Sequence, residues 1–270
     1  MKHRPNRFTA RAVGGLVVLF AASTTVRAVD VLFKNAPGTT SLTNNLNWDG
    51  AALPGVGDVA TWGAAAGGNS QGGALSWASG TGPSYQGIKV VDASANIAIT
   101  SAGGATTLTL GTGGIDMSGA LKDLSIHDSA TAGTTLGVVI GANQSWNVGS
   151  GRILAVGNSD TTFTLSNKLI KTGAGTFTLG GVGVTTLTGA GELEINGGVF
   201  NNNMQAGSSA TGRSGATTLT SGTISISTSV SMFGSGTIHL NGGAIGSFNA
   251  TGRDFGTGNA VNIGGNVQIG

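Results

Sequence analysis

One short unit recurs along this chain and constrains its fold more than any other feature. The unit is a glycine turn, a strand-like segment of about four residues and a second glycine turn: Gly173–Gly181 is matched by Gly189–Gly198 and Gly234–Gly243. Within each unit large apolar residues fall at every second position, the period of a strand that is buried on one face. So short a strand cannot bury its apolar face alone, which indicates that successive units stack on one another.

The composition excludes several other architectures. Glycine supplies 50 of the 270 residues, and each glycine inside a helix costs about 1 kcal/mol relative to alanine, which excludes a helical bundle. The chain has no cysteine, which excludes disulfide scaffolds and cysteine-based zinc sites. With only four prolines and no three-residue glycine period, it is not a collagen either.

We therefore predict an all-β chain folded as a parallel β-helix. Alternating segments are separated by glycine, asparagine and serine turns that leave no room for helices between them. Three short strands with their turns would make a coil of roughly 20–25 residues, the scale of a parallel β-helix. The alternative is an antiparallel β-sandwich with glycine-rich hairpins, which would call for more two-residue Asn-Gly or Asp-Gly turns between longer strands.

Residues 1–28 are typical of an export signal. A basic leading segment precedes the uncharged stretch Ala12–Val26, which is shorter than the roughly 20 residues that a membrane span needs. Small residues then lead to a cleavage site after Ala28, so that Val29 becomes the first residue of the exported chain. Beyond this signal the charged residues are eight basic and 11 acidic, which gives no basic surface for nucleic acid, and no later stretch resembles a membrane span.

The rest of the chain divides into two regions. Residues 29–87 hold Trp48, Trp62 and Trp77, and we predict that they form an irregular N-terminal cap with a Gly/Ala/Ser-rich loop at Gly63–Pro83. Residues 88–270 form the β-helix repeat region. Its last alternating segments stop in mid-pattern at the carboxyl end, so we expect that region to be truncated there or to associate with other chains through an open end.

Residues 169–181 resemble a known repeat. Leu169-Ile-Lys-Thr-Gly-Ala-Gly-Thr-Phe-Thr-Leu-Gly-Gly181 is similar to the LxKxGxGTLxLxG signature of the autotransporter-associated β-strand repeat, and Asn47-Trp48 and Pro54…Trp62 resemble the start of exported proteins that carry it. The resemblance implies a bacterial surface or secreted protein whose passenger is a right-handed parallel β-helix. It implies no catalytic residues and no cofactor.

Motifs for nucleophilic, phosphate and metal chemistry are weak in this chain. Gly68–Gly72 matches G-x-S-x-G but lies in a glycine-rich loop rather than between a strand and a helix. The G-x-G pairs are not followed by the third glycine of a dinucleotide site, and Gly111–Asp116 is a single imperfect copy of a calcium-binding repeat. Asp123, His127 and Asp128 are interpreted as a solvated turn, and strand parity predicts that His127 and His239 point outward.

Glu192 and Glu194 are the one candidate pair of catalytic carboxylates, because strand parity places them on the same outer face. We interpret them as solubilising residues and predict no catalytic, cofactor or metal site, and no enzyme activity. The function expected is that of an exported, secreted or surface-displayed structural or adhesive protein, with cell-surface glycans or other copies of the chain as partners. The alternative is a secreted β-helix enzyme that acts on polysaccharides.

Overall fold

The structure is a computed structural model of the whole chain. It describes residues 28–34, 40–63, 73–78, 80, 82–101, 103–129, 134–158, 160–226, 232–247 and 258–270. Residues 1–27 of the predicted signal and the Gly68–Gly72 motif lie outside the described residues.

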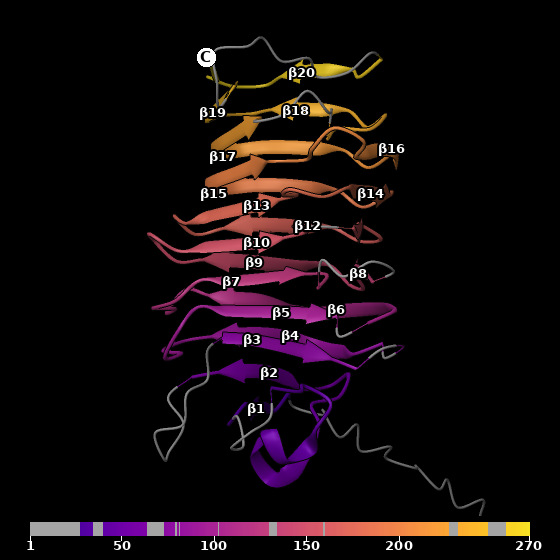
Figure 1. Cartoon of the computed structure of the whole chain (residues 1–270). Helices are drawn as coiled ribbons and strands as arrows, with labels where there is room; N and C mark the ends of the chain where they lie inside the picture. Colours follow the sequence, from indigo (N-terminus) through magenta and orange to yellow (C-terminus); the bar gives the residue numbers. More distant parts are fainter. Residues whose placement is uncertain are drawn as a thin grey trace, which may run out of the picture.

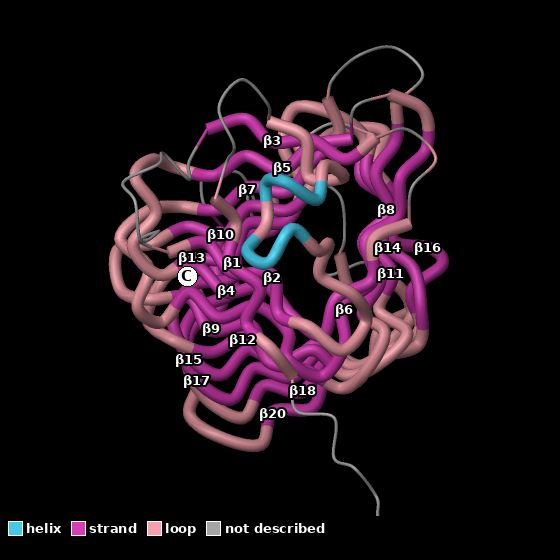
Figure 2. The backbone as a smooth tube through the Cα atoms, turned by 90° about the horizontal axis from the view of Figure 1, so that it is seen from below, coloured by secondary structure: helices cyan, strands magenta, loops and turns pink. Residues whose placement is uncertain are grey.

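The chain winds as a solenoid whose strands form three stacks, named here face 1, face 2 and face 3. Figure 1 shows the strands layered from the indigo β1 to the yellow β20, and the view along the stack in Figure 2 shows strands on three sides of a common interior. Along the chain the faces follow one another in the order 1, 2, 3, as β9, β10 and β11 illustrate.

Face 1 holds β1 (Asp30–Leu32), β2 (Val59–Trp62), the second part of β4 (Ser84–Val90), the second part of β6 (Ala105–Met117), β9 (Gln144–Val148), β12 (Leu169–Thr172), the first parts of β15 (Leu193–Asn202) and β17 (Thr217–Ile226), β18 (Ile238–Leu240) and β20 (Val261–Ile263). Face 2 holds β3 (Gly73–Trp77), β5 (Ile97–Ser101), β7 (Leu124–His127), β10 (Ile153–Val156), β13 (Thr176–Leu179), the second parts of β15 and β17, β19 (Ala244–Ser247) and β21 (Gln268–Ile269). Face 3 holds the first parts of β4 and β6, β8 (Thr135–Ile140), β11 (Thr161–Thr164), β14 (Thr185–Gly189) and β16 (Ser209–Arg213).

The prediction of a parallel β-helix is confirmed. Every pairing between the named strands of the described chain is parallel, which excludes the antiparallel sandwich. Thr164 and Thr188 are aligned in neighbouring coils, are 24 residues apart and join their hydroxyl groups at 3.1 Å. The coil therefore has the length that the sequence predicts.

Strand parity separates the interior from the surface as expected. Phe177, Leu193 and Ile238 are buried, while the alternate residues Thr178 and His239 are only partly covered. The interior aromatic rings also pack edge-on against one another from coil to coil. The ring centroid of Phe177 lies 4.9 Å from that of Trp146 and 5.1 Å from that of Phe200. The core is thus continuous along the axis rather than divided between coils.

The recurring glycine unit is not the repeat of the coil. The segment after Gly173 becomes β13 on face 2, whereas the segments after Gly189 and Gly234 become the first part of β15 and β18 on face 1. The same turn-and-strand pattern therefore serves two corners of the coil, since both corners need a tight turn before a short half-buried strand.

Aromatic side chains close the N-terminal end of the stack. The 3-10 helices η1 (Asn45–Asn47) and η2 (Asp49–Ala51) lie at this end, shown in cyan in Figure 2. Trp48 between them packs edge-on against Phe33 at 5.0 Å and against Trp62 at 5.7 Å between ring centroids. All three of these side chains are fully buried.

Stacked strands also occur within residues 29–87. β2 pairs with β1 on one side and with β4 on the other, so the coils begin ahead of residue 88. The prediction of a loop across Gly63–Pro83 is wrong at β3, where Leu75 and Trp77 are buried at alternate positions and give the segment a strand period inside its glycine-rich surroundings.

Within the part of the chain that the structure describes, no helix has the length and apolar character needed to cross a membrane.

Candidate functional site

The structure brings the predicted carboxylate pair into one polar cluster on face 1. Glu194 of β15 is aligned with Thr218 of β17, and Thr218 is aligned with His239 of β18, so these three outward side chains follow one another in successive coils. Glu192 lies one position before β15. Strand parity therefore placed both glutamates and His239 correctly on the outer surface.

A lysine from the preceding coil joins the two carboxylates. Lys168 Nζ lies 3.2 Å from Glu192 Oε2 and 2.7 Å from Glu194 Oε2. From the following coil, the hydroxyl of Thr218 donates to Glu192 Oε1 at 2.6 Å and that of Thr220 donates to Glu194 Oε1 at 3.3 Å. Both carboxylates are thus held by neighbours on both sides.

These contacts shift the pKa values of Glu192 and Lys168. Partial burial acts to raise the pKa of Glu192, but hydrogen bonds from Thr218 and Lys168, together with the nearby charges of Lys168 and His239, outweigh it and lower the pKa below its ordinary value. The hydrogen bond to Glu194, assisted by Glu192, raises the pKa of Lys168 against the effect of burial. The cluster is therefore a network of ion pairs around one ammonium group.

The position of Lys168 distinguishes this arrangement from an open pair of glycosidase carboxylates. Such a pair needs one carboxyl group whose pKa is raised so that it can donate a proton, and a space between the two groups for the sugar. Here the pKa of Glu192 is lowered, and the Lys168 ammonium binds both carboxylates. What the cluster offers is a fixed set of charged and hydroxyl groups on a sheet surface.

The residues near His127 do not form the single solvated turn that the sequence suggested. Asp123 accepts a hydrogen bond from the Ile153 N–H at 3.0 Å at one end of β7, while Asp128 lies at the other end and is buried. Strand alternation explains the difference, since His127 points outward and the next side chain must point inward. Asp128 Oδ2 accepts a hydrogen bond from the Thr134 hydroxyl at 3.2 Å.

The calcium-like segment Gly111–Asp116 belongs to the long strand β6 rather than to a repeated turn. Its Asp116 Oδ1 accepts a hydrogen bond from the Ser118 N–H at 2.9 Å. Among the described residues, no three His, Asp or Glu side chains gather closely enough to hold a metal ion.

Lys171 is the residue of the signature-like motif whose role the sequence did not predict. Its side chain is fully buried, and its Nζ donates to the carbonyl oxygens of Thr172, Gly173 and Gly197 at 2.8, 2.9 and 3.0 Å. Burial lowers the pKa of Lys171 to about 8. The ammonium group thus joins the turn between faces 1 and 2 of its own coil to the same turn of the next coil.

Arg213 plays a related part at another corner. It is also fully buried, and its guanidinium donates to the carbonyl oxygens of Phe233 at 2.9 Å and Ala216 at 2.8 Å. Burial lowers its pKa to about 10. Strand alternation is the signal that finds Lys171, which has the parity of the buried Leu169. It does not find Arg213, because the register of β16 shifts along the strand and its buried residues Ala210 and Arg213 have opposite parity.

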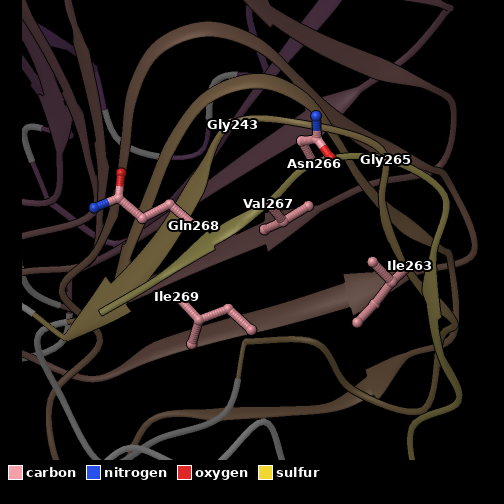
Figure 3. Close-up of a pocket in the computed structure, with 7 residues that line it drawn as sticks. All are labelled: Gly243, Ile263, Gly265, Asn266, Val267, Gln268 and Ile269. Atoms are coloured by element: carbon pink, nitrogen blue, oxygen red, sulfur yellow. The ribbon is translucent and has the colours of Figure 1, made fainter.

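The last coil of the structure exposes apolar side chains. Figure 3 shows Ile263, Val267 and Ile269 directed toward the interior of this coil, around a hollow of about 520 Å³. Ile263 is 64% exposed and Ile269 67%, whereas the equivalent Leu240 of the coil below is buried. No further strand lies on this layer in the described structure.

No family model matches the chain, and neither the curated proteins nor the solved structures contain a match to it.

Proposed function

We propose that the chain is an exported β-helix repeat protein of the autotransporter-associated type, with a structural or adhesive role at the cell surface or in the medium. Its short coils give a long molecule with a packed interior and outer faces of small hydroxyl residues and amides, a shape suited to holding a binding surface away from a cell. The signature-like segment at residues 169–181 and the signal-like residues 1–28 support the family and the export.

The observation that carries the non-enzymatic part of the proposal is the state of the Glu192–Glu194 pair. The carboxylate oxygens of both glutamates accept contacts from Lys168 and from two threonine hydroxyls, and the pKa of Glu192 is lowered. Such a pair suits a binding or solubilising surface better than it suits proton transfer. The competing proposal is a polysaccharide-cleaving enzyme, for which the position of two carboxylates on one face is the supporting observation.

The partners proposed are cell-surface glycans or further copies of the chain. Hydroxyl, amide and carboxylate groups on the outer faces can bind the hydroxyl groups of a glycan.

Two experiments test the proposal. Binding of the purified protein to a glycan array is expected to give reproducible signals for a restricted set of structures, and an array without signals would contradict the adhesive role. Amino-terminal sequencing of exported protein is expected to start at Val29. Recovery of the intact Lys2 or Arg4 in exported material would contradict cleavage after Ala28.

A further inference from the structure

Face 2 has a hollow of about 260 Å³ beside His127, away from the carboxylate cluster of face 1. It is lined by Ser125 and His127 of β7, Ala155 of β10, and Gly157, Asn158 and Gly180 from the turns that follow β10 and β13. β7 and β10 are paired strands in neighbouring coils, with Ser125 aligned to Ala155. Residues from three coils therefore meet at this place.

Small residues form most of the lining of the hollow. Val156 of β10 is aligned with Ile126 of β7 and with Leu179 of β13, so Gly157 and Gly180 occupy the positions next to His127 in the two following coils. Gly157 and Gly180 present only backbone to this space, since a Cβ on Gly157 would point toward Thr161 and Thr185, and a Cβ on Gly180 toward the backbone of Asn203. Ala155 contributes only a methyl group. The residues that line the hollow are therefore small and uncharged apart from His127.

The hydrogen bonds inside the protein define what each polar group offers a ligand. His127 Nδ1 lies 2.5 Å from the carbonyl oxygen of Asp128, so in the neutral ring this nitrogen carries the proton and Nε2 is the acceptor. Asn158 Oδ1 accepts from the Val182 N–H at 3.4 Å, which leaves its amide nitrogen to donate. Ser125 Oγ donates to the Ile97 carbonyl at 3.3 Å, which leaves its lone pairs to accept.

We propose that this hollow binds one ring of a neutral saccharide. Hydroxyl groups can both donate and accept, as the mixture of His127, Ser125 and Asn158 requires, and the Ala and Gly floor suits the C–H face of a sugar ring. Among the described residues that line the hollow there is no Asp, Glu, Lys or Arg, which favours a neutral over an acidic sugar. The inference rests on the proposed adhesive function and assigns it a ligand class and a place.

The test is titration of the full chain with cellobiose, lactose, maltose and chitobiose, followed by calorimetry and by amide NMR shifts. At least one of these sugars is expected to bind and to shift amides of β7 and β10. Ala155→Phe should abolish that binding by filling the hollow. His127→Phe keeps a planar ring but lacks the acceptor, and should weaken binding about tenfold, the equivalent of one hydrogen bond.

Ser225→Phe is the matched control, because Ser225 points outward from β17 on the same face but does not line the hollow. It should bind the sugar as the parent protein does, and thermal melting should show that all three variants remain folded. Unchanged binding by the Ala155 and His127 variants would overturn the site and leave adhesion standing. Binding of acidic glycans alone on the array would likewise overturn the ligand class, whereas a chain that binds no glycan contradicts the adhesive function itself.

Discussion

Replacing Lys171 by methionine isolates the contribution of a buried ammonium group to the stacking of coils. Methionine has nearly the same length and no charge, so it leaves little cavity but takes away the donor to three carbonyl oxygens. A hydrogen bond to a charged group contributes about 1.5–3 kcal/mol, and the variant also escapes the cost of keeping an ammonium group away from water. We expect the unfolding free energy to fall by about 1.5–3 kcal/mol, the value of one such hydrogen bond. The loss of the other two hydrogen bonds is offset because the variant no longer buries a charge.

The pH dependence measures a different quantity, the free-energy cost of burying the charge of Lys171. The folded pKa of Lys171 is about 8, below the ordinary value of 10.5, so between these pH values the unfolded chain binds a proton that the folded chain has released. The unfolding free energy of the parent protein should therefore rise with pH across this window. The cost of burying the Lys171 charge is fully present below pH 8. The methionine variant lacks that rise, so the difference in unfolding free energy between the two proteins should widen from pH 8 toward pH 10.5.

Urea unfolding followed by circular dichroism at several pH values measures both effects. Lys168→Met is the matched control: it is the same substitution three positions earlier, at a side chain that is 35% exposed and bound in surface ion pairs. It should cost less than about 1 kcal/mol. A Lys171→Met protein as stable as the parent, with a parallel pH profile, would refute the idea that this ammonium joins the coils.

Three further predictions concern the core, the turns and the ion pairs. Leu193→Ala should cost about 2–5 kcal/mol by opening a cavity, whereas Thr178→Ala on the surface should cost well under 1 kcal/mol; equal losses in urea unfolding would contradict the parity of the strands. Gly222→Ala should destabilise more than Gly151→Ala in the same assay, because both have positive φ (85° and 70°) but only at Gly222 would the new Cβ lie 2.5 Å from a carbonyl oxygen, that of Gly198 in the preceding coil. The lowered pKa of Glu192 contributes stability that is present above its ordinary pKa of 4.5 and is lost as the pH falls below it, so Glu192→Gln should flatten the acid limb of the unfolding midpoint between pH 6 and 3.

Strand alternation made most of the fold predictable, together with the outward direction of the carboxylate pair. It assigned the interior positions of β13, β15 and β18 and the outward direction of Glu194 and His239, since a period of two fixes the face of each side chain once one residue is placed. Applied equally to Lys171, the same rule places it inside. Lys171 was not assigned to the interior because lysine side chains generally lie at the surface.

Other features depended on contacts between distant coils, which a single sequence does not display. The partnership of Lys168 with Glu192 and Glu194 requires the register of β12 against β15. The hollow beside His127 likewise requires the alignment of glycines from two later coils. β3 was not predicted because it lies in a segment of low-complexity composition, where Leu75 and Trp77 alone show the alternation of a strand.

Incubating the purified protein with a panel of polysaccharides and measuring new reducing ends is the most direct test of the non-enzymatic, surface-binding role. We predict binding to part of a glycan array with no release of reducing sugar above the blank, and the same null release for a protein that carries Glu192→Gln and Glu194→Gln. Release of reducing ends by the parent protein that disappears in this double variant would contradict the account and establish the carboxylate pair as catalytic.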